Sequence, residues 1–311
     1  MALAEAPGSY GRPGWFARGA QVFSLGAVPP PALILLGIVS VQIGAGVAKH
    51  LFVRLPPDAV VLMRLFTSAV VLGFLSRRVL RAVLRDHSWR DLSVAGGFGL
   101  TLALMNFSIY QSMARIPLGI AVTIEFLGPL VVAIVASRRR LDLVWAALAL
   151  GGVLMLARGG GAVTVAGVAF ALLAGVCWAG YILLSAATGK RFAGSTGLAM
   201  ASIVGTVAML PVGVAAGGTA LLDPELLVIG AAIGLLSSVI PYSLELEALR
   251  RVPARVFGIL MSLEPAVAAL VGLVILGEVL SVREWAAIGC VIVACVGSTR
   301  GQKEPPTAPE G

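Results

Sequence analysis

The chain has 311 residues, of which 59% are hydrophobic and 12% are charged, and its mean hydropathy is +0.99. A soluble domain carries about 25% charged residues, so this composition excludes an ordinary soluble enzyme and places the chain in a lipid bilayer. The formal net charge of +8 would favour a nucleic-acid partner in a soluble protein, but here the basic residues lie between long apolar runs.

Ten apolar runs follow a Gly-, Pro- and Ala-rich tail of residues 1–29, which lacks the features of a signal peptide. The runs are close to 20 residues long and lack the alternation of barrel strands, so they predict transmembrane helices in an all-α polytopic membrane protein. Residues 300–311 are rich in Pro and Glu and are expected to be disordered. The predicted helices are 30–48, 57–76, 92–112, 117–136, 141–157, 164–187, 197–216, 226–248, 252–276 and 281–299.

The basic residues between these runs gather on one side of the predicted bundle. Most of them, including Arg77, Arg78 and 138–140, fall on the side of the two termini. By the positive-inside rule we expect a multi-pass protein of the inner membrane with both termini in the cytoplasm. No nucleic-acid partner is then needed to explain the charge. The basic residues expected outside are Lys49, Arg54, Arg115, Arg158 and Arg283.

An internal repeat divides the chain into two halves. Pro117 and Pro129 are matched at an offset of 136 residues by Pro253 and Pro265. The halves, residues 30–157 and 164–299, hold five predicted helices each, and an odd number makes the second half enter the membrane from the opposite side. Such inverted repeats are typical of secondary transporters with a site near the bilayer midplane, although a duplication could also serve only to build a stable bundle.

Several segments resemble one family of transporters. The segment 117–129, together with 241–245, Glu264-Pro265 and 276–278, resembles the threonine/homoserine exporters of the EamA-type drug/metabolite transporter superfamily. The resemblance implies two inverted five-helix halves and export of threonine, homoserine or related amino acids in exchange for protons. Gln42 departs from the wider superfamily, in which many members carry Trp at this position.

Two acidic residues lie near mid-depth in predicted helices. An ionisable side chain there costs about 2.5–3.5 kcal/mol on insertion scales, which makes Glu125 and Glu264 functional candidates. Met261, the repeat equivalent of Glu125, is three residues before Glu264, so on a continuous helix both carboxylates would face one cavity. Loss of water favours the neutral carboxyl group, which could release its proton to bind a substrate ammonium. The alternative is a hydrogen bond that locks the helix beside Pro129 or Pro265.

Arg64 and Glu245 are further candidates. Arg64 could bind a substrate carboxylate in the bidentate way that guanidinium favours, or it could extend to the membrane interface or neutralise a buried Glu. Glu245 is the better site candidate of the two neighbouring acids, because Glu247 could pair with Arg250 or Arg251. Polar residues expected along the path, each of which could instead bond between helices, are Gln42, Asn106, Tyr110, Thr123, Tyr181, Tyr242 and Ser262.

Helix breakers and small residues have structural interpretations as well. Pro129, Pro241 and Pro265 are expected inside helices, where they would kink the axis. The pairs Gly213/Gly217 and Gly230/Gly234 are expected to allow close helix packing rather than dimerisation, although a homodimer stays open.

Other classes of protein fit the sequence less well. An intramembrane enzyme would need a nucleophile with its base or a metal motif, and none is present; a passive channel would need a repeated polar ring. Another metabolite or a drug-like compound remains an alternative cargo. We expect no enzyme activity, no metal and no cofactor, with the proton-motive force as the energy source. The expected partners are small zwitterionic amino acids, protons and the lipid bilayer.

Overall fold

The computed structural model describes residues 28–86, 88–137, 141–157, 163–192, 196–249, 251–252 and 254–300. Nearly all of the predicted N-terminal tail and residues 301–311 of the C-terminal tail lie outside these ranges, as do Arg158, Pro253 and 138–140. Within the described ranges every regular element is helical.

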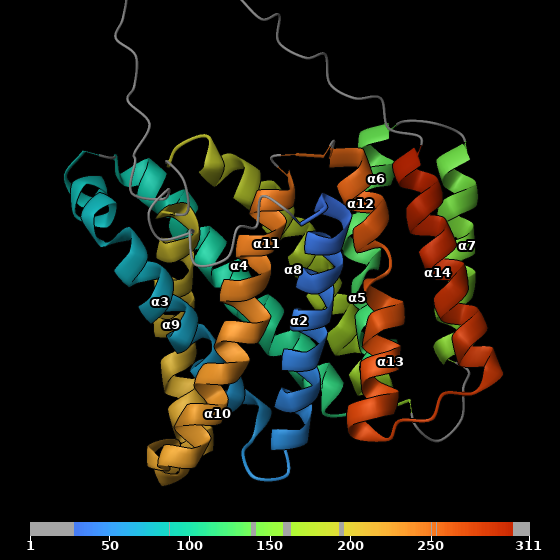
Figure 1. The fold of residues 1–311 in the computed structure, drawn as a ribbon, viewed down its shortest axis with the longest axis horizontal. Helices are drawn as coiled ribbons and strands as arrows, with labels where there is room; N and C mark the ends of the chain where they lie inside the picture. Colours follow the sequence, from blue (N-terminus) through green and yellow to red (C-terminus); the bar gives the residue numbers. More distant parts are fainter. Residues whose placement is uncertain are drawn as a thin grey trace, which may run out of the picture.

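The first half of the chain forms α2 to α7, and the second half forms α8 to α14 (Figure 1). Nine described helical stretches are long and apolar enough to cross a membrane, and a tenth, α7, has a shorter apolar part, Leu143–Leu156. The predicted spans are confirmed as helices, with ends shifted by a few residues in most cases. The first-half bounds are α2 Pro30–Leu51, α3 Pro57–Asp86, α4 Trp89–Met113, α5 Leu118–Glu125, α6 Leu127–Ser137 and α7 Leu141–Ala157.

The second half adds a short 3₁₀ segment and a π-helical segment to its α-helices. Thr164 caps α8 by accepting a bond from the Gly167 amide over 3.1 Å, and Asp223 caps α10 in the same way from Glu225 over 2.9 Å. The bounds are α8 Val165–Gly189, α9 Thr196–Gly217, η3 Gly218–Leu222, α10 Pro224–Gly234, η4 Leu235–Val239, α11 Ile240–Leu249, α12 Ala254–Met261, α13 Glu264–Leu276 and α14 Val282–Arg300.

Two membrane spans are interrupted. The span 118–137 breaks at Phe126 into α5 and α6, and the span 254–276 breaks at Ser262 and Leu263 into α12 and α13. The expectation that Met261 and Glu264 share one continuous helix is therefore wrong. Met261 ends α12, as Glu125 ends α5, whereas Glu264 begins α13.

Of the three prolines expected inside helices, Pro241 does lie inside a continuous helical run, formed by α10, η4 and α11, whereas Pro129 and Pro265 stand in the first turns of the helices that follow the two interruptions. Pro129, Pro241 and Pro265 are the third, second and second residues of α6, α11 and α13. Proline is tolerated at the starts of α6 and α13 because the first amides of a helix have no intrahelical partner. Pro211 in α9 also lies inside a helix.

Glycines allow the helices of the two halves to pack closely. Added Cβ atoms at Gly213 and Gly217 of α9 would lie within 2.8 Å of α3 side chains, and those at Gly230 and Gly234 of α10 within 2.5 Å. Both glycine pairs thus bring a second-half helix against α3, which confirms their expected use in packing. Further close pairs are α4 with α8, α2 with α11, α5 with α13 and α7 with α14.

Candidate functional site

A central cavity of about 540 Å³ lies between the two halves, bounded by residues from both interrupted spans. Its size falls in the range of small-molecule sites. All but one of the predicted site residues lie on its wall, whereas their roles in binding stay predictions. These residues are Gln42, Arg64, Asn106, Tyr110, Glu125, Tyr181, Tyr242, Glu245, Ser262 and Glu264.

Glu264 begins α13 at the interruption and has one hydrogen-bond partner. Its Oε1 accepts a bond of 2.9 Å from Nε2 of Gln42 on α2, which belongs to the other half of the chain. Its Oε2 and the Oε1 of Gln42 are buried and have no partner among the described residues. Two acceptors at one point of the wall suit a ligand that brings hydrogen-bond donors.

Glu125 ends α5 on the same cavity wall. No hydrogen bond or ion pair reaches its carboxylate within the described part of the chain, although only 8% of the residue is exposed. Its backbone lies close to α8, because a Cβ at Gly175 would be 2.9 Å from the Glu125 carbonyl oxygen. A helix-locking hydrogen bond beside Pro129 is therefore wrong for Glu125.

Arg64 lies on α3 and directs its guanidinium to the cavity wall. Nη1 donates to the Tyr110 hydroxyl over 3.4 Å, and Nη2 donates to the Ser237 carbonyl oxygen over 3.0 Å. Among the described residues no carboxylate lies within ion-pair distance of Arg64, and its Nε is buried without a partner. These contacts exclude both an extension to the interface and a direct ion pair with a buried Glu. A positive group with an unused donor remains at the cavity.

Glu245 of α11 also lines the cavity, and it packs near Gly37 of α2, where an added Cβ would be 3.5 Å from its Cγ. Glu247 pairs with Arg251, as predicted, and lies outside the cavity wall. Close to Glu245 in sequence, Tyr242 shares a 3.0 Å hydroxyl contact with Tyr181 of α8. This contact links α8 and α11 across the cavity.

One expected lining residue is placed elsewhere. Thr123 is fully buried in α5, where its hydroxyl donates to the Gly119 carbonyl oxygen over 2.6 Å, and it is not part of the cavity wall. A hydroxyl that bonds one turn back on its own helix needs no contact with the cavity. Ser262 makes a similar bond to Gly258, but it does line the cavity.

Some cavity residues were not predicted from the sequence. Phe126 and Trp178 form an edge-to-face pair with ring centroids 4.7 Å apart beside Glu125. Ser237, in the π-helical segment, supplies the carbonyl oxygen that holds Arg64. Trp178 could have been predicted as a cavity residue, because it is the repeat equivalent of Gln42. Nothing in the sequence marked Ser237. Among the described residues no cluster of three His, Cys, Asp or Glu side chains could hold a metal ion.

The cavity wall includes Phe257, Gly258 and Thr299, which lie near the end of the bundle where α2 begins and α14 ends. Ion pairs join helices at the opposite end. Lys49 at the end of α2 lies 2.5 Å from Glu278 and also donates to the Ile116 carbonyl oxygen.

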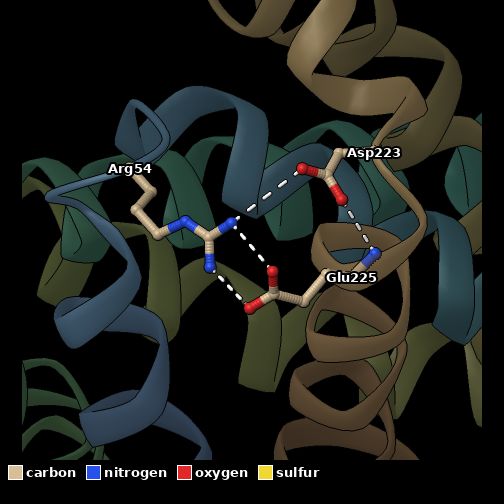
Figure 2. A network of polar contacts seen from close by, with 3 residues as sticks. All are labelled: Arg54, Asp223 and Glu225. Carbon is tan, nitrogen blue, oxygen red and sulfur yellow. Dashed lines mark hydrogen bonds and ion pairs between the residues drawn. The ribbon is translucent and has the colours of Figure 1, made fainter.

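A second ion pair at that end is more exposed. Figure 2 shows Arg54 between two acidic residues at the start of α10; it contacts Glu225 over 2.6 and 3.1 Å and Asp223 over 3.9 Å. Together with the Lys49 contacts, these bonds join α2, the α2–α3 connection, α10 and the segment after α13. These contacts tie the bundle together at the end where α2 ends and α10 begins.

Membrane-spanning helices around one cavity with ionisable walls define a transporter-like membrane protein. Residues 165–300 match the model of the EamA-like transporter family. The threonine/homoserine exporter RhtA of Escherichia coli (strain K12) is 39% identical over 274 residues, covering 87% of this chain and 91% of that relative. RhtA of Salmonella typhimurium (strain SL1344) matches with the same identity and coverage.

The chain belongs to the EamA-like transporter family, as the sequence segments predicted, and it is a transporter rather than an enzyme. A solved crystal structure with 15% identity aligns to 87% of this chain and 96% of its own length, with a TM-score of 0.59. This likeness concerns the fold alone.

Proposed function

We propose that the protein exports small zwitterionic amino acids, such as threonine and homoserine, across the inner membrane in exchange for protons. The observation that carries the proposal is the presence of Glu125, Glu264 and Arg64 on one cavity wall. Carboxylates suit an ammonium group and guanidinium suits a carboxylate, so the wall offers both charges that a zwitterion needs. The names of the relatives at 39% identity supply the two amino acids.

The same carboxylates support proton exchange. Glu125 has no described partner, and one oxygen of Glu264 has none. When no substrate is bound, such a carboxyl group has the lower free energy in its protonated form. When the ammonium group of a substrate binds, the charged carboxylate becomes the favoured form. Proton and substrate then bind alternately, which is the requirement for exchange driven by the proton-motive force.

An arrangement as two inverted halves would suit an exchange between the two sides of the membrane. The packing pairs support the proposal, because exchanging the halves turns α4 with α8 into α11 with α2 and leaves α3 with α9 and α7 with α14 in place. The interruptions after Glu125 and after Met261 fall at equivalent positions, which also favours a repeat. The side on which basic residues gather supports cytoplasmic termini. A homodimer is not needed, since one chain forms the cavity.

Transport by purified protein in liposomes tests the proposal. We expect an imposed pH gradient to drive labelled threonine and homoserine through the wild type, and the movement to be lost in Glu125→Gln and Glu264→Gln. Glu247→Gln is the matched control, because Glu247 pairs with Arg251 outside the cavity. A folded wild type that moves neither amino acid would overturn the cargo, whereas full activity of both cavity variants would overturn the coupling role.

A further inference from the structure

We infer that Asn106 determines specificity by accepting a hydrogen bond from the side-chain hydroxyl of the substrate. The inference rests on the proposed function and goes beyond it, because it explains how hydroxy amino acids would be separated from apolar ones of equal shape. One face of α4 borders the cavity. Asn106, Ile109, Tyr110 and Met113 recur there at helical spacing, and all four line the cavity.

The hydrogen bonds of Asn106 fix which of its atoms is free. Its Nδ2 donates to the Leu102 carbonyl oxygen over 2.8 Å, and a carbonyl oxygen can only accept, so this atom must be the amide nitrogen. Oδ1 is then the free atom, and it is buried with no partner among the described residues. A buried acceptor without a donor carries a free-energy penalty that a ligand with a donor removes.

The charged groups of the cavity leave this acceptor to the substrate side chain. Glu125 and Glu264 suit the ammonium group, and Arg64 suits the carboxylate. Asn106 is uncharged and lies one helical turn, about 6 Å along the axis, from Tyr110, whose hydroxyl is bonded to Arg64. A substrate of the length of threonine or homoserine can therefore hold its carboxylate near Arg64 and its hydroxyl near Asn106.

Three serine hydroxyls in the region are worse candidates. The hydroxyl of Ser237 lies against α2, where a Cβ on Gly44 would be 2.2 Å from its oxygen, so no substrate fits between them. Ser108 is buried on α4 with an unbonded hydroxyl, but it does not line the cavity. The Ser262 hydroxyl already has Gly258 as a partner, so it carries no penalty of the kind that a ligand would remove from Asn106 Oδ1.

The test compares threonine with valine, which has the same shape and lacks the hydroxyl. We expect wild-type protein in liposomes to transport threonine at least about tenfold more efficiently than valine, because valine leaves the acceptor unpaired. Asn106→Leu keeps the side-chain size and removes the acceptor. We expect it to abolish the preference by slowing threonine while valine transport stays unchanged. Ser108→Ala, the matched control on the same helix, keeps the wild-type ratio.

Each contrary result overturns the inference in a recognisable way. A leucine variant that keeps the threonine preference, or that slows both amino acids equally, means that Asn106 does not read the hydroxyl. Equal transport of threonine and valine by the wild type contradicts it even if the variant fails to fold, and leaves the proposed function standing. Transport of neither amino acid by the wild type overturns the proposed function, and the inference with it.

Discussion

Gln42 and Glu264 join the two halves of the chain at the cavity, through a 2.9 Å hydrogen bond between residues 222 positions apart. Both side chains are buried, and each keeps one oxygen without a described partner. The bond holds the carboxylate of Glu264 at the point where α13 begins. Its loss would leave both oxygens of a buried carboxyl group unpaired, which is costly in a low-dielectric site.

Replacing Gln42 by Met, which has a similar size and no donor, tests the importance of this bond. We expect the threonine transport rate to fall by about tenfold and stability to fall by about 1–3 kcal/mol, the cost of an unpaired buried group. Liposome transport and thermal unfolding in detergent measure the two effects. Ser40→Ala is the control, because Ser40 bonds to Leu236 from the same helix but does not line the cavity. A control that impairs transport equally would contradict a specific role for Gln42.

The contact of α6 with α8 predicts a steric effect. A Cβ at Gly128 would lie 2.0 Å from the carbonyl oxygen of Gly175, and backbone cannot move aside cheaply. We expect Gly128→Ala to reduce stability by about 1–3 kcal/mol, the usual cost of overpacking. Gly151→Ala on α7 should instead raise stability by up to about 1 kcal/mol, since nothing lies within 4 Å of its Cβ position and alanine favours a helix more than glycine does. Equal unfolding temperatures for the two variants would contradict this packing.

The Lys49–Glu278 ion pair predicts a stability loss that a second substitution repairs. Only 17% and 16% of the two side chains are exposed, so Lys49→Met or Glu278→Gln alone leaves a partly buried charge without its partner. We expect each single variant to lose about 3 kcal/mol, and the double variant to regain part of that loss. Thermal unfolding of the four proteins forms a double-mutant cycle. Additive losses would show that the two residues are not coupled.

The exposed pair at the same end provides a comparison. The side chains of Arg54 and Glu225 are 47% and 63% exposed, and solvent screens their attraction. Arg54→Gln should therefore lower the unfolding temperature less than Lys49→Met does. A larger effect of Arg54→Gln, measured in the same detergent, would mean that the exposure of the side chains does not decide which ion pair contributes more to stability.

The apolar runs were sufficient to predict the membrane helices, because about 20 consecutive apolar residues have few alternatives to a spanning helix. The acidic residues at mid-depth could be chosen as cavity candidates for the same reason, since an unneeded charge there is costly. Both Glu125 and Glu264 do line one cavity. The repeat spacing also aligned Glu125 with Met261, and each of them ends a helical segment.

The interruptions of two spans could not be predicted from these patterns. Hydropathy stays high through Phe126 and through Ser262, and proline is compatible with both a kinked helix and a new helix start. Contacts between distant residues were equally hidden, because the Lys49–Glu278 pair and the Arg64–Ser237 bond depend on how helices pack. Thr123 was wrongly expected on the cavity wall, because neither helical spacing nor polarity reveals that its hydroxyl bonds to the backbone of its own helix.

The most direct test of the account is whether threonine and protons are exchanged through the same protein. Liposomes loaded with threonine and a pH-sensitive dye are diluted into threonine-free buffer, and amino-acid efflux and internal pH are followed at once. We predict that efflux through the wild type acidifies the lumen, and that Glu125→Gln and Glu264→Gln abolish the acidification while Glu247→Gln preserves it. Threonine efflux through the wild type without any change of internal pH would contradict proton exchange at this cavity.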